Sequence, residues 1–285
     1  MVPQELVDGF QHFAHNKREV GRAWLLGSRA LGTATTNSDW DVALELRMPT
    51  DKARHRFAGE VDTWTRQLTK ATKLTIDLKL FNTPETPDIE KALRGCGRLF
   101  FIPRPALVHE VGHLVVGDAA GNNEQGIIFG FNQLKPDEMA GCAGMPRHPE
   151  IGMKRSLAGA TACLLVSPEA FPDELVKALG FSVLPSASHP GREILLDQAN
   201  VALTGMSTDT TYARAFAERI CGRDDEKIDT LLREQEGWVR SAIADRVRAI
   251  EAVVADIQAW LRDEDPGDNR MMLYPGHCAL KIIHG

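Results

Sequence analysis

Two histidines and a glutamate within residues 105–116 have the types and the spacing of a zinc site. His109 and His113 are four residues apart, so a helix presents both imidazoles on one face, within reach of one Zn²⁺ ion. Glu110 then projects near the same ion, where we expect it to act as a general base toward the water molecule that zinc activates. The apolar neighbours of the two histidines predict that this helix is buried.

A catalytic zinc ion needs three protein ligands and one open position, so the histidine pair requires a third ligand from elsewhere. Spacing alone does not choose among the downstream histidines and carboxylates. The available side chains are His148, Glu150, His189 and Asp209. His148, His189 and His277 lie in stretches rich in proline or glycine, which are typical of solvated loops.

A second group of chemistry-bearing residues precedes the histidines. Gly27 and Ser28 follow an apolar stretch that we expect to be a strand. Asp39 and Asp41 are two residues apart at the start of the next strand, so alternation places both carboxylates on one face. Asp77 is expected to add a third carboxylate from a neighbouring strand.

Carboxylates placed together repel one another unless a cation lies among them. Mg²⁺ prefers oxygen ligands and keeps open positions for phosphate oxygens. This arrangement suits two-metal phosphoryl or nucleotidyl transfer. Ser28 and the adjacent backbone amides would hold the departing phosphates.

This first pattern resembles the minimal nucleotidyltransferases of the polymerase-beta-like superfamily, whose signature is Gly-Ser, a short gap, Asp-x-Asp and a later aspartate on a strand. The resemblance covers about residues 5–82, and Gly32 also fits the turn of that family. It implies a Mg²⁺ site that works with a nucleoside triphosphate. The residues implied are Gly27, Ser28 and Arg29 for nucleotide binding, and Asp39, Asp41 and Asp77 for catalysis and magnesium.

The histidine helix resembles the zinc helix of the FtsH-type peptidases, which take their third ligand from an aspartate early in a later helix. The stretch 205-GMSTDTTYARAFAER-219 places Asp209 at that position, and residues 156–165 resemble the small-residue helix between the two. The resemblance spans about residues 105–222 and implies a zinc site of His109, His113 and Asp209. Cys163 and Leu164 depart from it, because that family has an acidic residue after the small-residue stretch.

The elements that position these residues follow from hydrophobic periodicity. The first part is expected to hold an amphipathic helix, a hairpin-like pair of strands, a crossover helix and a third strand. These lie at residues 4–19, 22–26, 40–46, 51–71 and 74–81. The second part is expected to be mainly helical, with helices at residues 151–166 and 208–222 and one helix of about forty residues over 224–264.

Prolines and small residues between positions 82 and 104 predict a junction between two domains. We expect a nucleotidyltransferase-like domain at residues 1–85 and a zinc-peptidase-like domain at 104–285. The predicted fold class is α+β, with a small mixed sheet and helices followed by a mainly α-helical, zincin-like peptidase domain.

Composition limits the partners and the cellular setting. The net charge of −6, from 39 acidic and 33 basic residues, argues against a broad nucleic-acid-binding face. Five cysteines without a Cys-x-x-Cys pair are typical of reduced thiols in a cytoplasmic protein. The sequence has no apolar run of the ~18 residues that cross a bilayer.

The leading hypothesis is a zinc-dependent metalloendopeptidase fused to a nucleotidyltransferase-like domain that regulates or targets it. The sequence has no Walker loop, so the ATPase motor of the FtsH-type enzymes is absent from it. The expected partners are a protein or peptide substrate, a nucleoside triphosphate and a regulatory partner protein. One alternative is a Mg²⁺-dependent nucleotidyltransferase that modifies a protein or RNA partner, of toxin-antitoxin or defence type, with a regulatory or degenerate zinc domain. Another is a regulatory binding module in which the first domain senses nucleotide or a partner and the zinc domain responds.

Overall fold

The computed structural model describes the protein as two compact units of an α+β fold with mostly helical content. The first unit contains the chain up to Pro103 and residues 256–267, and the second contains most of the remainder. The described residues are 2–17, 19–81, 87–122, 125–128, 141–143, 148–168, 171, 182–184, 206–263, 270–273 and 280–283.

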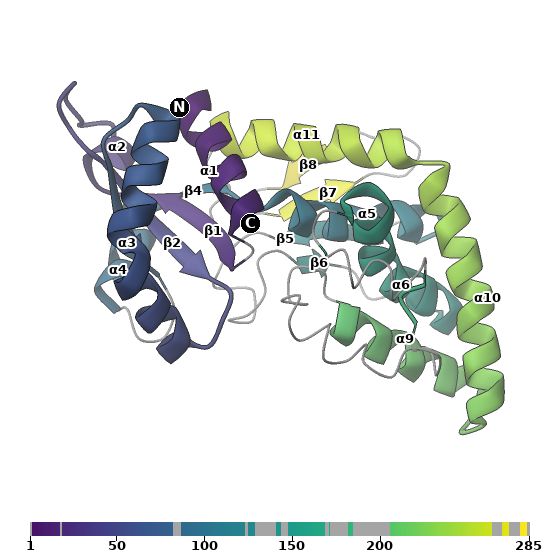
Figure 1. Ribbon diagram of the computed structural model, residues 1–285. Coiled ribbons are helices and arrows are strands. Elements are labelled where there is room, and N and C mark those ends of the chain that lie inside the picture. Colours follow the sequence, from purple (N-terminus) through teal and green to yellow (C-terminus); the bar gives the residue numbers. More distant parts are fainter. Residues whose placement is uncertain are drawn as a thin grey trace. The chain divides into compact units, whose positions relative to one another are not determined.

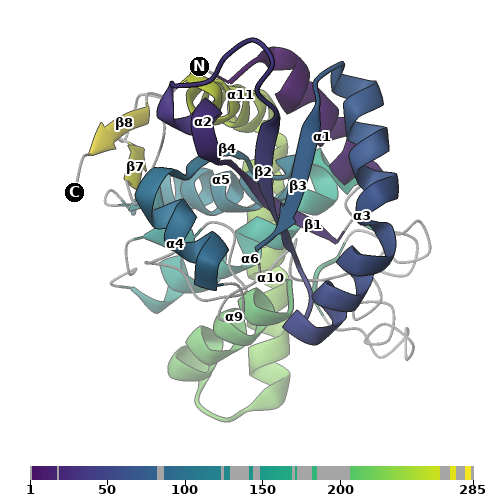
Figure 2. The same cartoon turned by 90° about the vertical axis from the view of Figure 1, so that its left-hand side faces the viewer.

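A four-stranded mixed sheet forms the centre of the first unit (Figure 2). Its strands follow the order β3-β2-β1-β4, in which β1 is antiparallel to both β2 and β4, whereas β2 is parallel to β3. The strands are β1 (Val20–Leu25), β2 (Trp40–Leu46), β3 (Ile76–Leu80) and β4 (Arg98–Phe101). A parallel pair needs a crossover connection, and α3 (Thr50–Thr72) supplies it, as the sequence predicts.

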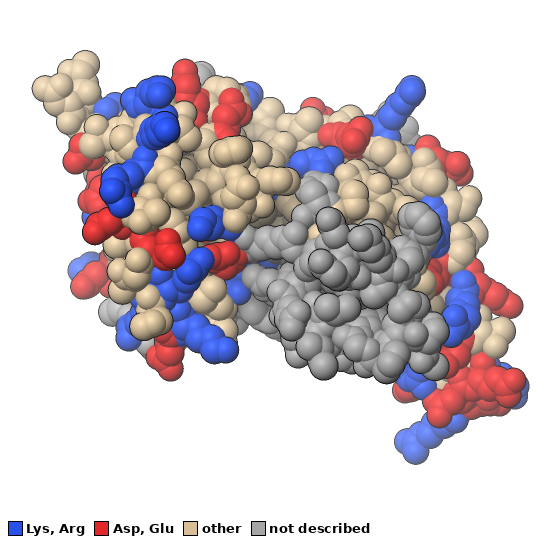
Figure 3. Space-filling view, viewed as in Figure 1, with Lys and Arg blue, Asp and Glu red and all other residues tan. Residues whose placement is uncertain are grey.

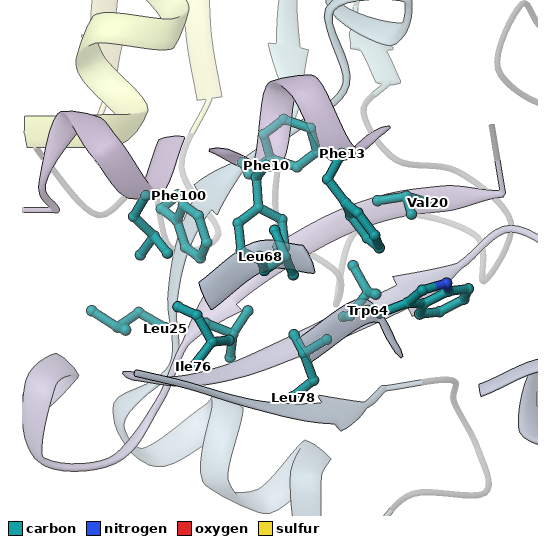
Figure 4. Close-up of a cluster of buried hydrophobic side chains, with 14 of the residues drawn as sticks. Phe10, Phe13, Val20, Leu25, Trp64, Leu68, Ile76, Leu78 and Phe100 are labelled. Atoms are coloured by element: carbon teal, nitrogen blue, oxygen red, sulfur yellow. The ribbon is translucent and has the colours of Figure 1, made fainter. Parts of the chain in front are cut away.

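The first unit also contains the helices α1 (Gln4–Asn16), α2 (Gly27–Leu31) and α4 (Pro87–Cys96). The apolar faces of α1 and α3 pack on the sheet, and Figure 4 shows Phe10, Trp64 and Leu68 converging with side chains from the strands. These three side chains are fully buried. Their burial anchors the strands that carry the aspartates, because each such side chain contributes about 1.5–3 kcal/mol.

The first unit extends beyond the predicted domain end at residue 85. The predicted junction 82–104 contains α4 and also β4, which pairs with β1. The end of α11 (Val247–Asp263) also belongs to this unit, because the backbone N–H of Val2 and the guanidinium of Arg98 both donate to the carbonyl of Arg262. No local pattern in the sequence indicates this long-range pairing.

Four helices of the second unit form a bundle centred on α6 (Figure 1). They are α5 (Arg104–Ala119), α6 (Pro149–Val166), α9 (Met206–Cys221) and α10 (Asp225–Ala244). Small residues let α5 and α6 approach closely. A Cβ atom added at Gly112 would lie 2.5 Å from the Cβ of Ala162 and 3.0 Å from the carbonyl oxygen of Ala158.

The second unit also contains a four-stranded antiparallel sheet, which the prediction of a mainly helical domain does not include. Its strands are β5 (Gln125–Ile128), β6 (Gly141–Ala143), β7 (Arg270–Leu273) and β8 (Leu280–Ile283). Each strand has only three or four residues, too few to produce a clear alternation in the sequence.

The predicted forty-residue helix over 224–264 is wrong, because the chain forms α10 and α11 with a turn at residues 245–246. No glycine or proline lies at this turn, so the break has no local sequence signal. Among the described residues, no helix combines the length and the apolar character needed to cross a membrane.

Candidate metal centre

Three side chains from two helices converge in the second unit. His109 and His113 lie one turn apart on α5, with their Nε2 atoms 2.9 Å from each other. Asp209, in the first turn of α9, places its Oδ2 atom 3.3 Å from each of these nitrogens. The three side chains are only 7%, 9% and 13% exposed. Within the described part of the chain, they are the one group of three such residues with the spacing of metal ligands.

The hydrogen-bonding pattern around His113 fits a cation between these atoms. Its Nδ1 atom lies 2.7 Å from the carbonyl oxygen of Arg155, which can only accept, so Nδ1 carries the hydrogen. The Nε2 atom of a neutral ring then has a lone pair, and this lone pair faces Oδ2 of Asp209, which is another acceptor. Oδ2 is buried, and while the Nε2 atoms that face it carry no proton it has no hydrogen-bond donor among the described residues. Two acceptors in contact repel each other unless a proton or a metal ion lies between them.

The spacing of the three donor atoms matches zinc. Bond lengths of about 2.0–2.1 Å put two ligand atoms of a tetrahedral zinc ion about 3.3–3.4 Å apart. The two distances to Asp209 agree with this value, and the distance between the histidine nitrogens is 0.4 Å shorter than these two. Two imidazoles and one carboxylate also form a donor set that zinc accepts in catalytic sites. The residues present therefore fit the ion that the sequence predicts.

Electrostatics tie His113 to the neighbouring acids. Complete burial lowers the pKa of His113, but the negative charges of Asp209 and Glu110 raise it more, so the net pKa lies above the ordinary value of 6.5. In the metal-free protein, a proton on His113 therefore compensates part of this negative charge.

Glu110 follows His109 on α5 and lies beside the cluster. Its Oε1 atom is 3.9 Å from Nε2 of His109, and its side chain is 11% exposed. A buried carboxylate next to two zinc-type imidazoles is suitably placed to take a proton from a water molecule in the cluster.

Helix α6 supports both histidines from one side. Gly159 lies against the imidazole of His109, and a Cβ atom added there would lie 2.6 Å from Nδ1 and 2.7 Å from Nε2 of that ring. One turn earlier, the carbonyl of Arg155 fixes the tautomer of His113. Gly159 lies in the small-residue stretch that carries part of the resemblance to the FtsH-type peptidases. The sequence did not reveal the role of Arg155, because a backbone carbonyl has no residue signature.

The first unit brings together part of the predicted nucleotide site. Asp41 of β2 pairs in register with Asp77 of the parallel strand β3. Gly27 adopts a left-handed conformation with a φ of 61° and lies so close to Asp41 that an added Cβ atom would be 2.5 Å from Oδ2. Gly27, at the start of α2, therefore adjoins Asp41 of the aspartate pair.

The structure adds three observations about this region that the sequence motif does not include. Lys79, which no sequence motif singled out, places its Nζ atom 2.6 Å from Asp77 and 3.7 Å from Asp41. The hydrogen bond to Asp77 raises the pKa of Lys79, despite a smaller opposing effect of burial. Arg29 donates to the carbonyl of Ser38, and its guanidinium lies 4.5 Å from the ring centroid of Trp40, so it braces the turn. Asp39 is exposed just before β2 begins.

Two of the other candidate zinc ligands, His148 and Glu150, do not join the cluster. His148 and Glu150 are exposed at the start of α6, and neither belongs to the group of converging ligand atoms. His189 and His277 lie outside the described residues.

Neither a search of protein-family models nor a search of curated proteins found a match to this chain. The function is therefore inferred from the arrangement of the side chains.

Proposed function

We propose that this protein is a zinc-dependent hydrolase of peptide bonds that works without an ATPase motor. The observation that carries the proposal is the convergence of two imidazole nitrogens and one carboxylate oxygen, all within 4.8 Å of one another and almost completely buried. Structural zinc sites use four protein ligands, whereas three ligands with one open position are typical of catalytic sites.

In this proposal, His109, His113 and Asp209 hold the ion, which supplies Lewis acidity toward a water molecule and a substrate carbonyl. Glu110 accepts the proton of the attacking water and then delivers it to the leaving amine. The carbonyl of Arg155 keeps the hydrogen on Nδ1 of His113, so that Nε2 remains available as a ligand.

A peptide substrate is inferred from the resemblance to the FtsH-type peptidases. The two stretches that carry it, around His109 and around Asp209, are about a hundred residues apart in the sequence. Their side chains meet in one site, as that resemblance requires. This agreement supports a peptidase more strongly than the His-Glu-x-x-His motif does alone.

For the first unit we propose a nucleotidyltransferase-like role in regulating or targeting the hydrolase, through binding of a nucleoside triphosphate. The register of Asp41 with Asp77, beside Gly27 at the start of α2, supports this role. The alternative, a Mg²⁺-dependent nucleotidyltransferase that modifies a protein or RNA partner, would need both carboxylates to bind Mg²⁺, and the ammonium group of Lys79 beside them argues against it.

The direct test of hydrolysis is a Glu110→Gln variant assayed with a library of unstructured peptides. The amide cannot accept the proton of water, so we expect peptide cleavage to fall at least about a hundredfold while bound zinc and the melting temperature stay unchanged. The matched control is Glu150→Gln, which removes an exposed carboxylate outside the cluster. If Glu110→Gln cleaves peptides at the same rate as wild type, the proposed mechanism is wrong.

A further inference from the structure

Lys79 places its ammonium group beside both carboxylates of the aspartate pair in the first unit. Because β2 and β3 are parallel and in register at Asp41 and Asp77, their carboxylates emerge side by side. Lys79 is two residues beyond Asp77, so alternation along β3 directs its side chain to the same face. Its ammonium group bonds to Asp77 at 2.6 Å and lies 3.7 Å from Asp41.

The third aspartate does not complete a metal site here. Asp39 is exposed, and the three carboxylates are absent from the groups of converging ligand atoms found among the described residues. The first unit therefore presents two paired carboxylates that share the positive charge of Lys79. This arrangement does not fit the two-ion centre that the resemblance to nucleotidyltransferases implies.

We propose that Lys79 is the resident counter-ion of Asp41 and Asp77, and that it excludes Mg²⁺ from this pair in the wild-type protein. A divalent ion could use both carboxylates only after the Lys79–Asp77 bond has broken. Even then, an ammonium group remaining about 4 Å away would repel a divalent ion and weaken its binding by about thirtyfold in water. The first unit thus resembles a nucleotidyltransferase in which the ammonium group of Lys79 takes the place of the metal ion. It does not catalyse Mg²⁺-dependent nucleotidyl transfer.

The test is to count bound Mn²⁺, which takes the same oxygen ligands as Mg²⁺ and is detected by its paramagnetism. Free Mn²⁺ is titrated by electron paramagnetic resonance against wild type, Lys79→Gln, Lys79→Arg and the double variant Asp77→Asn/Lys79→Gln. Lys70→Gln is the control, because it removes an exposed lysine of α3 outside the aspartate pair. Circular dichroism verifies that each variant is folded.

We expect Lys79→Gln to bind one Mn²⁺ ion at least about tenfold more tightly than wild type. Lys79→Arg and Lys70→Gln should behave as wild type, and the added Asp77→Asn change should abolish the gain. The dependence on Asp77 locates the ion, so binding at the histidine cluster does not affect the result. If wild type already binds Mn²⁺ tightly through Asp77, or if Lys79→Gln gains no affinity, the proposal is wrong.

Discussion

His113 contacts a backbone carbonyl with one ring nitrogen and the proposed metal-binding cluster with the other. Its Nδ1 atom bonds to a backbone carbonyl, and its Nε2 atom faces His109 and Asp209. The backbone therefore selects the tautomer, and a proton or a metal ion must occupy the other side of the ring. The metal-free and zinc-loaded proteins should consequently respond differently to pH.

The raised pKa of His113 predicts how the stability of the metal-free protein depends on pH. The folded protein binds this proton more tightly than the unfolded chain does, so the contribution is fully present below pH 6.5 and is lost as pH rises through the raised pKa. A tenfold difference in proton affinity between the folded and unfolded states corresponds to about 1.4 kcal/mol of unfolding free energy. Urea unfolding of protein treated with a chelator should show this loss.

The same urea unfolding series with an Asp209→Asn variant tests whether Asp209 causes the pH dependence of stability. Removing the charge of Asp209 removes the largest influence that raises the pKa of His113, so the loss of stability with rising pH should shrink. An unchanged pH profile in this variant would contradict the assigned coupling between the two side chains.

At the scale of elements, α6 positions the two histidines that α5 carries. Gly159 leaves space for the ring of His109, and Ala is the smallest change that fills it. We expect Gly159→Ala to displace the ring and to weaken zinc binding by about 10- to 100-fold, the range found when a residue supporting a ligand is altered. Zinc affinity can be measured by competition with a chromophoric chelator.

Gly152→Ala is the matched control for this prediction. It adds the same methyl group to the same helix, where the Cβ atom would lie 2.6 Å from the ring of Phe216. We expect both glycine variants to lose about 1–3 kcal/mol of unfolding free energy, the usual order of magnitude for overpacking. Gly152→Ala should lose less zinc affinity than Gly159→Ala. Equal loss of zinc affinity in both variants would mean that Gly159 serves packing alone. The absorption spectrum of the Co²⁺-substituted protein gives a second readout of ligand geometry.

The sequence predicts some elements well because their signals are local. The spacing of His109 and His113 needs only a helix, and the alternation around Asp41 and Asp77 needs only strands. Lys79 was within reach of the same reasoning, since it lies two residues from Asp77 on the same face of β3.

Other features depend on contacts between distant parts of the chain. The pairing of β5 with β7 joins strands more than a hundred residues apart, and neither strand has more than four residues. The turn between α10 and α11 at Asp245 contains no helix-breaking residue. Which downstream side chain completes the histidine pair also required the fold, although the resemblance to a peptidase family indicated Asp209.

At the scale of the whole molecule, one chain carries two clusters of ionisable side chains, the histidine cluster with Asp209 and the Asp41–Asp77 pair with Lys79. On the face shown in Figure 3, lysine and arginine are interspersed with aspartate and glutamate across the described residues, without one extended field of either sign. A mixed face of this kind does not steer a polyanion toward it.

Coupling between the sites is a prediction at this scale, motivated by α11, which has residues in both units. If the first unit regulates the hydrolase, nucleoside triphosphate and peptide substrate must change each other's affinity by the same factor. The affinity for a peptide substrate is measured with and without each nucleotide, in wild type and in an Asp39→Ala/Asp41→Ala variant. We expect a nucleotide-dependent change of about 5- to 150-fold in peptide affinity that the variant loses. Equal affinities in all conditions would leave the first unit as a passive recognition domain.

The most direct test of the metal centre is the zinc content of the purified protein, measured by mass spectrometry of the metal after dialysis against a weak chelator. We expect about one zinc ion per chain in wild type, and substantial loss in His113→Ala and in Asp209→Ala, because each variant removes one of three ligands. His148→Ala, which changes an exposed histidine, should keep the full content. Absence of zinc from folded wild type that has been offered the ion, or full zinc content in both ligand variants, would contradict the proposed metal centre.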